Sequence, residues 1–109
     1  MKKFLLFLFL IPSLVGAQSM TVKSFLENKN DPRVARWVGA EGNAFNTFNA
    51  YLIPSKQNPF CPPTNIALNT ENYMKILDDY LNVHPQDNPE EFPVAIVLLW
   101  ALLDAFPCQ

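Results

Sequence analysis

Few side chains in this sequence have the types and spacing that catalysis or metal binding requires. His84 is the single histidine, and no G-x-S-x-G, H-E-x-x-H or P-loop pattern occurs. Asp78 and Asp79 are adjacent, but neighbours on a helix do not face each other, which favours a solvated polar face over an acid–base pair. We therefore expect no enzyme, and we interpret His84 as a polar residue near a helix end.

Cys61 and Cys108 are the only two cysteines of the chain. They form neither the C-x-x-C pair of a redox site nor a C-x-x-C-H haem attachment motif. One histidine and two distant cysteines do not match a zinc ligand set, so no metal site and no cofactor are expected. In an oxidising compartment two such thiols pair, and the sequence predicts a structural disulfide between Cys61 and Cys108.

The first residues have the pattern of an export signal. Lys2 and Lys3 precede an apolar run, and Val15, Gly16 and Ala17 fit a V-x-A cleavage site. We expect a signal peptide over residues 1–17, cleaved near Ala17, and a mature periplasmic domain over residues 18–109. A retained membrane anchor is the alternative, but the run is shorter than the about 20 residues of a spanning helix.

Length and composition limit the chain to one globular domain. Of its 109 residues, 50% are hydrophobic and 17% are charged. Removal of residues 1–17 leaves six basic and ten acidic residues, so the mature chain has a net charge of −4. Nothing in this charge pattern favours a nucleic-acid partner.

Periodic apolar segments separated by prolines predict an all-α fold, a small bundle of about four helices with one disulfide. The expected helices cover residues 20–27, 32–53, 70–83 and 93–106. The proline-rich stretch over residues 54–68 lacks a period and is predicted to be a loop, which carries one of the two cysteines.

Gly39 and Gly42 interrupt the second expected helix, and each costs about 1 kcal/mol relative to alanine. Close packing against another backbone would compensate for this cost. A bend or functional hinge is the alternative interpretation, and we favour close packing.

The last expected helix, PVAIVLLWALLDAF, is apolar on nearly every side, with Asp104 as its one charge. Such a helix needs partners all round, and a domain of this size can hardly enclose it. We predict that it forms the centre of the bundle and also joins two copies into a two-fold homodimer; burial within one protomer is the alternative. The expected dimer interface consists of Ile96, Leu99, Trp100 and Leu103.

A short joint connects the last two expected helices and contains two prolines that stiffen it. An inhibitor of a concave active site needs a protruding, partly rigid segment, and acidic side chains could meet basic or metal-bearing groups in such a cleft. An ordinary solvated turn, with Glu91 capping the next helix, is the alternative. The candidate partner-binding residues are His84, Pro85, Gln86, Asp87, Asn88, Pro89, Glu90 and Glu91.

The stretch FCPPTNIALNTENYMKILDDYL, the HP that follows it and the closing AFPC resemble the immunity proteins of type VI secretion amidase effectors, the Rap/Tai family. The similarity covers residues 37–108, and the spacing from FCPP to FPC is its most specific part. Family members often carry a cysteine in the helix that corresponds to residues 32–53, and this chain has none there.

The resemblance implies a small, helical, usually dimeric periplasmic protein that binds a peptidoglycan amidase effector and blocks its cleft without catalysing a reaction. The leading hypothesis is therefore an immunity protein that inhibits a cell-wall amidase. The alternative is a periplasmic chaperone-like or stress protein that binds other proteins. The low charged fraction disfavours an acid-activated chaperone, which depends on many titrating groups.

Overall fold

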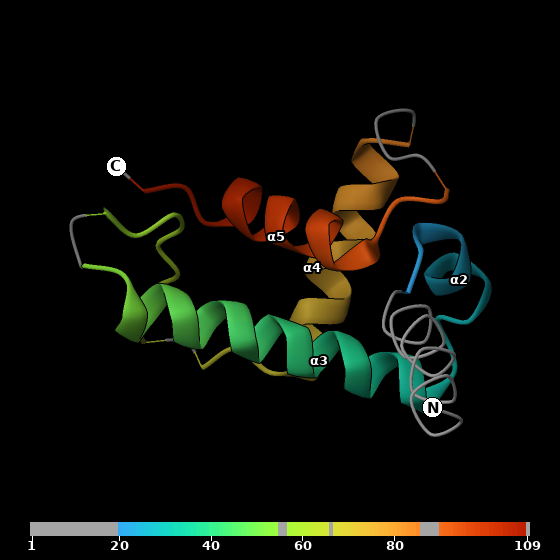
Figure 1. Ribbon diagram of the computed structural model, residues 1–109, viewed down its shortest axis with the longest axis horizontal. Helices are drawn as coiled ribbons and strands as arrows, with labels where there is room; N and C mark the ends of the chain where they lie inside the picture. The colour runs from blue at the N-terminus through green and yellow to red at the C-terminus, as the bar shows by residue number, and fades with distance from the viewer. Residues whose placement is uncertain (1–19, 55–56, 66, 86–89, 109) are drawn as a thin grey trace, which may run out of the picture.

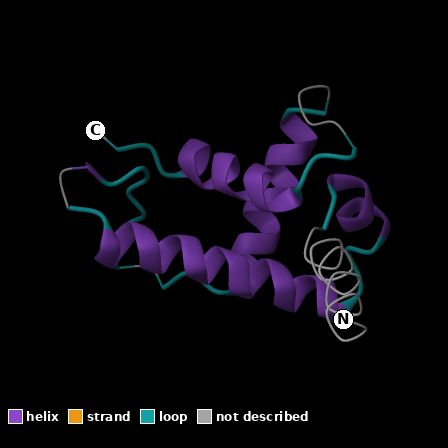
Figure 2. Cartoon of the chain, in the orientation of Figure 1, coloured by secondary structure: helices purple, strands orange, loops and turns teal. Residues whose placement is uncertain are grey.

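The computed structural model describes residues 20–54, 57–65, 67–85 and 90–108 of the chain. Its helices are α2 (Val22–Glu27), α3 (Pro32–Thr47), α4 (Thr70–Val83) and α5 (Val94–Ala105), and a π-helical turn, η1 (Phe48–Leu52), extends α3. Within these residues helices are joined by loops, and no strand is present (Figure 2). The predicted all-α bundle is confirmed, and the expected signal peptide lies outside the described residues.

Side chains at the helix starts explain why the sequence predicted the boundaries to within about two residues. Thr21 caps α2, Asp31 caps α3 and Asn69 caps α4, each by accepting a hydrogen bond from a backbone N–H of the first turn. Asn69 and Asn72 exchange two such bonds of 2.9 Å in a capping box. These caps satisfy N–H groups that a helix leaves unpaired.

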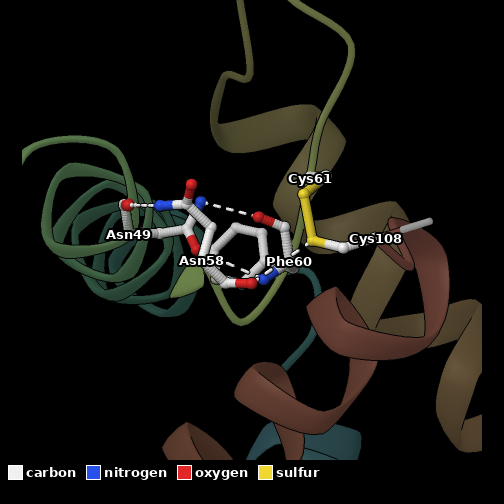
Figure 3. The surroundings of a disulfide bond; sticks show 5 residues. All are labelled: Asn49, Asn58, Phe60, Cys61 and Cys108. Carbon is white, nitrogen blue, oxygen red and sulfur yellow. Dashed lines mark hydrogen bonds between the residues drawn. A yellow bond between two sulfur atoms is a disulfide. The ribbon is translucent and has the colours of Figure 1, made fainter. Parts of the chain in front are cut away.

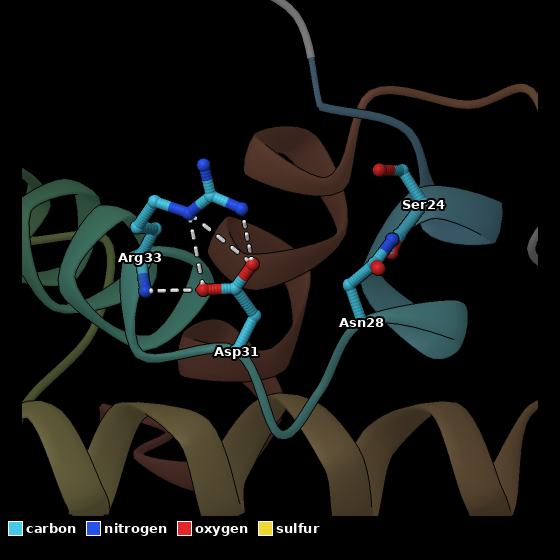
Figure 4. A network of polar contacts seen from close by, with 4 residues as sticks. All are labelled: Ser24, Asn28, Asp31 and Arg33. Carbon is cyan, nitrogen blue, oxygen red and sulfur yellow. Dashed lines mark hydrogen bonds and ion pairs between the residues drawn. The ribbon is translucent and has the colours of Figure 1, made fainter.

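The corner between α2 and α3 is built from short-range polar contacts (Figure 4). The Asn28 amide donates to the Ser24 carbonyl at 2.8 Å, closing the end of α2. Asp31 accepts from the Arg33 backbone and guanidinium, both at 2.9 Å, and this bonding lowers the pKa of its carboxyl. A carboxyl with a lowered folded-state pKa stabilises the fold above its ordinary pKa, and that contribution is lost as the pH falls through the folded value.

The closest helix contact lies between α3 and α4, where the two glycines of α3 face side chains of α4. A methyl group on Gly39 would overlap the Thr70 side chain, and one on Gly42 would overlap the ring of Tyr73. Tyr73 is fully buried at this contact, and burial raises the pKa of its phenol. The contact is close, as predicted, but it is made with side chains of α4 and not with another backbone, and α3 continues through both glycines.

The hydrophobic core lies where α5 packs against α3 and α4 (Figure 1). Every described helix contributes to it, and so does one residue of the loop after η1, Phe60. One side of α5 is fully buried in this core. The expectation that the last helix lies at the centre of the bundle therefore holds for that side of the helix. The largest fully buried core residues are Phe25, Phe60, Tyr73, Leu77, Leu98 and Leu102.

We predict that Gly42→Ala destabilises the protein by about 1–3 kcal/mol, because the added methyl group overpacks the ring of Tyr73. This cost exceeds the gain in helix propensity of about 1 kcal/mol. Urea unfolding measures the change. Asn43→Ala, at the adjacent exposed position of α3, is the control and should leave stability unchanged or slightly raised; equal stability of the two variants would contradict the close contact.

Candidate functional site

The side chains considered first for chemistry lie along the second half of α4 and have separate contacts. Asp78 pairs with Lys29 at 3.0 Å, and Asp79 pairs with Lys75 one turn away on α4. His84 caps the end of α4, with its ring centroid 4.4 Å from that of Tyr80. Among the described residues there is no group of three or more metal-ligating side chains, and no described helix is long and apolar enough to cross a membrane.

The loop after η1 is fixed by one buried polar side chain, Asn49, which is 4% exposed. Its amide nitrogen donates to the Phe60 carbonyl at 2.8 Å, and its amide oxygen accepts from the Phe60 N–H at 3.2 Å. The Asn58 amide in turn donates to the Asn49 carbonyl (Figure 3). We call these contacts the Asn49 clamp. They satisfy polar groups that burial would otherwise leave unpaired, and they hold the Phe60 side chain in the core.

The predicted disulfide is present and joins the clamped loop to the end of the chain. Cys61 and Cys108 are bonded, with their Cα atoms 5.0 Å apart. The Cys61 N–H also donates to the Phe106 carbonyl at 2.8 Å, so the backbone links the same two segments. The loop, the end of η1 and the C-terminal segment therefore meet at one end of the molecule (Figure 1).

An open hollow of about 450 Å³ lies at this end, between the last turns of α3, η1 and α5. Within the part of the chain that the structure describes, no charged side chain lines it. The aromatic ring of Phe48 is 53% exposed beside it, and Tyr51 on η1 is 82% exposed. We call it the apolar hollow; its lining residues are Ala44, Phe45, Phe48, Asn49, Ile53, Pro59, Phe60, Leu99 and Leu103.

The residues expected at a dimer interface divide between this hollow and its surroundings. Leu99 and Leu103 line the hollow. Ile96, on the same helix, is 41% exposed, and Trp100 is half-buried, with its ring 5.6 Å from that of Phe92. All four side chains thus keep some solvent exposure in a single protomer.

The joint between α4 and α5 lies near α2, toward the opposite end of the molecule (Figure 1). Its last residues are paired with the first turn of α2: the Val22 N–H donates to the Phe92 carbonyl, and the Lys23 N–H to the Glu90 carbonyl, both at 2.9 Å. The Val94 N–H donates to the carbonyl of residue 20 at 2.8 Å. Of the predicted partner-binding residues, Gln86, Asp87, Asn88 and Pro89 lie outside the described residues.

A second hollow, of about 270 Å³, opens beside the joint, and two predicted partner-binding residues, Pro85 and Glu90, line it. Leu26, which is 43% exposed, and Asn82 lie in the same wall. We call this the joint hollow. Unlike the apolar hollow, it is lined by a carboxylate, that of Glu90, beside apolar side chains.

Sequence reasoning missed the Asn49 clamp and the apolar hollow. One signal for the clamp was present, because Asn49 follows Phe45 by four residues and so falls on the buried side of its helix. A polar residue at such a position needs a buried hydrogen-bond partner. Its partner in the loop could not be named, because that loop has no periodic pattern.

Comparison with known proteins gives no further identification: no family model, curated protein or solved structure matches this chain.

We predict that replacing Cys61 and Cys108 by serine lowers the free energy of unfolding by about 4 kcal/mol, the chain-entropy value for a cross-link across 47 residues. Urea unfolding of the double variant measures the loss, and wild-type protein reduced with dithiothreitol should match it. Two alkylatable thiols in protein isolated without reductant, or a purely intermolecular bond, would contradict the pairing.

Proposed function

We propose that this chain is a periplasmic immunity protein, a non-catalytic inhibitor that binds the peptidoglycan amidase effector of a type VI secretion system and blocks its cleft. The motif resemblance supplies the target class. An exposed disulfide is compatible with an oxidising compartment.

One structural observation supports an inhibitory role most directly: the backbone from residue 90 to residue 94 is pinned by three hydrogen bonds to the chain around the start of α2. Glu90 and Glu91 are exposed on this pinned backbone. A segment that is already ordered loses less conformational entropy when it enters a partner's cleft.

The joint also has the mixed chemistry of a protein-binding surface. Glu90 offers a carboxylate that can steer an electropositive cleft toward the joint. Leu26 and Pro85 offer apolar contact beside it, in the wall of the joint hollow. Exposed apolar atoms within a polar rim are typical of protein interfaces.

We predict that replacing Asp87 by Asn and Glu90 by Gln together weakens inhibition of the cognate amidase by about tenfold or more, because steering charges are lost. The melting temperature should stay nearly unchanged, since Glu90 is exposed and its backbone contacts remain. Inhibition is measured with the purified cognate amidase effector, at low and at physiological ionic strength.

Glu71→Gln, at an exposed position in the first turn of α4, is the matched control and should inhibit like the wild type. If the double variant inhibits as strongly as this control, the contact surface lies elsewhere, and the loop after Ile53 is the next segment to test.

We further propose that the protein is a two-fold homodimer joined through the face that contains the apolar hollow. Phe48 lines this hollow and is largely exposed, and Ile96 is an exposed residue of α5 about one helical turn before the lining residue Leu99. One face of the protein can therefore supply both exposed apolar side chains and a recess. A two-fold interface brings the same patch of two copies together, and each projecting side chain then meets the recess of its partner. Exposed apolar patches are typical of such contact surfaces.

We predict a dimer by light scattering at high micromolar concentration, and Phe48→Ser should weaken it by about tenfold or more through loss of the aromatic contact. Val83→Ser is the control, because Val83 is 72% exposed but lies at the end of α4, outside the lining of the hollow. A wild-type protein that scatters as a monomer at this concentration would overturn the dimer.

One observation favours the alternative chaperone-like function, namely that the apolar hollow is open and uncharged. A chaperone would bind unfolded client chains there and prevent their aggregation. Suppression of aggregation that Phe48→Ser abolishes, together with no inhibition of the amidase, would favour this alternative over immunity.

A further inference from the structure

The two cysteines are flanked by non-covalent contacts that hold their backbones together. Cys61 directly follows Phe60, whose N–H and carbonyl are both bonded to the buried Asn49 side chain. Cys108 lies two residues after Phe106, whose carbonyl accepts from the Cys61 N–H at 2.8 Å. Figure 3 shows the clamp and the disulfide side by side.

The hydrogen bonds of Phe60 and of the Cys61 N–H involve backbone and amide groups only, so a chain with reduced cysteines can also form them. The Phe60 side chain is 1% exposed, so its position is determined by burial in the core as well as by Asn49. Cys61 and Cys108 are themselves exposed. A folded, reduced chain would therefore hold its two thiols close together while leaving them accessible to an oxidant.

We propose that Asn49 is a positioning residue for disulfide formation: the clamp places the Cys61 thiol against the Cys108 thiol in the reduced, folded chain, and oxidation then locks a loop that is already in place. The oxidant is a small-molecule disulfide such as oxidised glutathione. One cysteine thiolate attacks it and releases one glutathione thiolate, which leaves a mixed disulfide. The other cysteine thiolate displaces the second glutathione, so two electrons pass from the protein to the oxidant.

In this arrangement the Cys61–Cys108 pair has a high effective concentration, because the intervening chain does not have to search for contact. If the disulfide instead placed the loop, the reduced loop would move freely and the effective concentration would be that of a flexible chain of the same length. Replacement of Asn49 distinguishes these two situations, because it lowers the effective concentration of the thiol pair only if the clamp places the loop.

The test measures this effective concentration in the full chain by equilibration with reduced and oxidised glutathione, followed by alkylation and mass spectrometry. Asn49→Leu keeps a similar side-chain volume and removes both bonds to Phe60, and Asn58→Ala removes only the bond to the Asn49 carbonyl. Asn72→Ala is the matched control, because it removes an asparagine whose side chain accepts a hydrogen bond from the Asn69 N–H in the capping box of α4 and not from the clamp. Circular dichroism of each reduced and oxidised form reports folding.

We expect Asn49→Leu to lower the effective concentration by about tenfold or more and Asn58→Ala to lower it by a smaller factor, while Asn72→Ala stays within about twofold of the wild type. If Asn49→Leu does not fold, the difference between Asn58→Ala and Asn72→Ala decides. Equal values for the clamp variants and the control would overturn the proposal, as would a wild-type chain that loses its helical signal on reduction.

Discussion

The structure depends on the close approach of α3 and α4, which is set by two residues that lack side chains. At Gly42 the ring of Tyr73 occupies the space that a side chain would fill, and at Gly39 the Thr70 side chain does the same. These two helices make the most extensive contact in the described fold. The approach buries Tyr73 completely and forms the surface on which α5 packs. The energetic cost of two glycines in a helix is thus offset by packing that larger residues would prevent.

The two candidate surfaces, the face with the apolar hollow and the joint between α4 and α5, lie at opposite ends of the bundle, and different contacts hold the chain at each end. At one end the Asn49 clamp and the disulfide hold the proline-rich loop. The hollow that remains there is lined mainly by apolar side chains of α3, η1, α5 and this loop. At the other end, backbone pairing to the start of α2 holds residues 90–94, and the side chains of Glu90 and Glu91 are exposed. An apolar face suits a permanent contact between copies, and a polar joint suits a partner that is bound only when it is present.

Much of the fold could be predicted from the sequence because its signals are local. Helix ends are marked by prolines at or just beyond them, namely Pro32, Pro54 and Pro85, and two helix starts are marked by the capping residues Asp31 and Asn69. The few residues around each boundary are therefore enough to predict it. The disulfide followed from the presence of only two cysteines. The long-range contacts could not be predicted in this way. Asn49 finds its partner in a loop without periodicity, and the pairing of the joint with residues 20–23 joins segments far apart in the chain.

Hydrogen–deuterium exchange of the chain, alone and mixed with the proposed amidase effector, tests the central claim most directly. The account predicts that binding slows exchange in residues 20–26 and 84–94, the segments that form the pinned joint and its hollow, because a bound partner excludes water from them. Slowed exchange only around the apolar hollow, or no change anywhere at saturating amidase, would contradict the claim that the joint is the inhibitory surface.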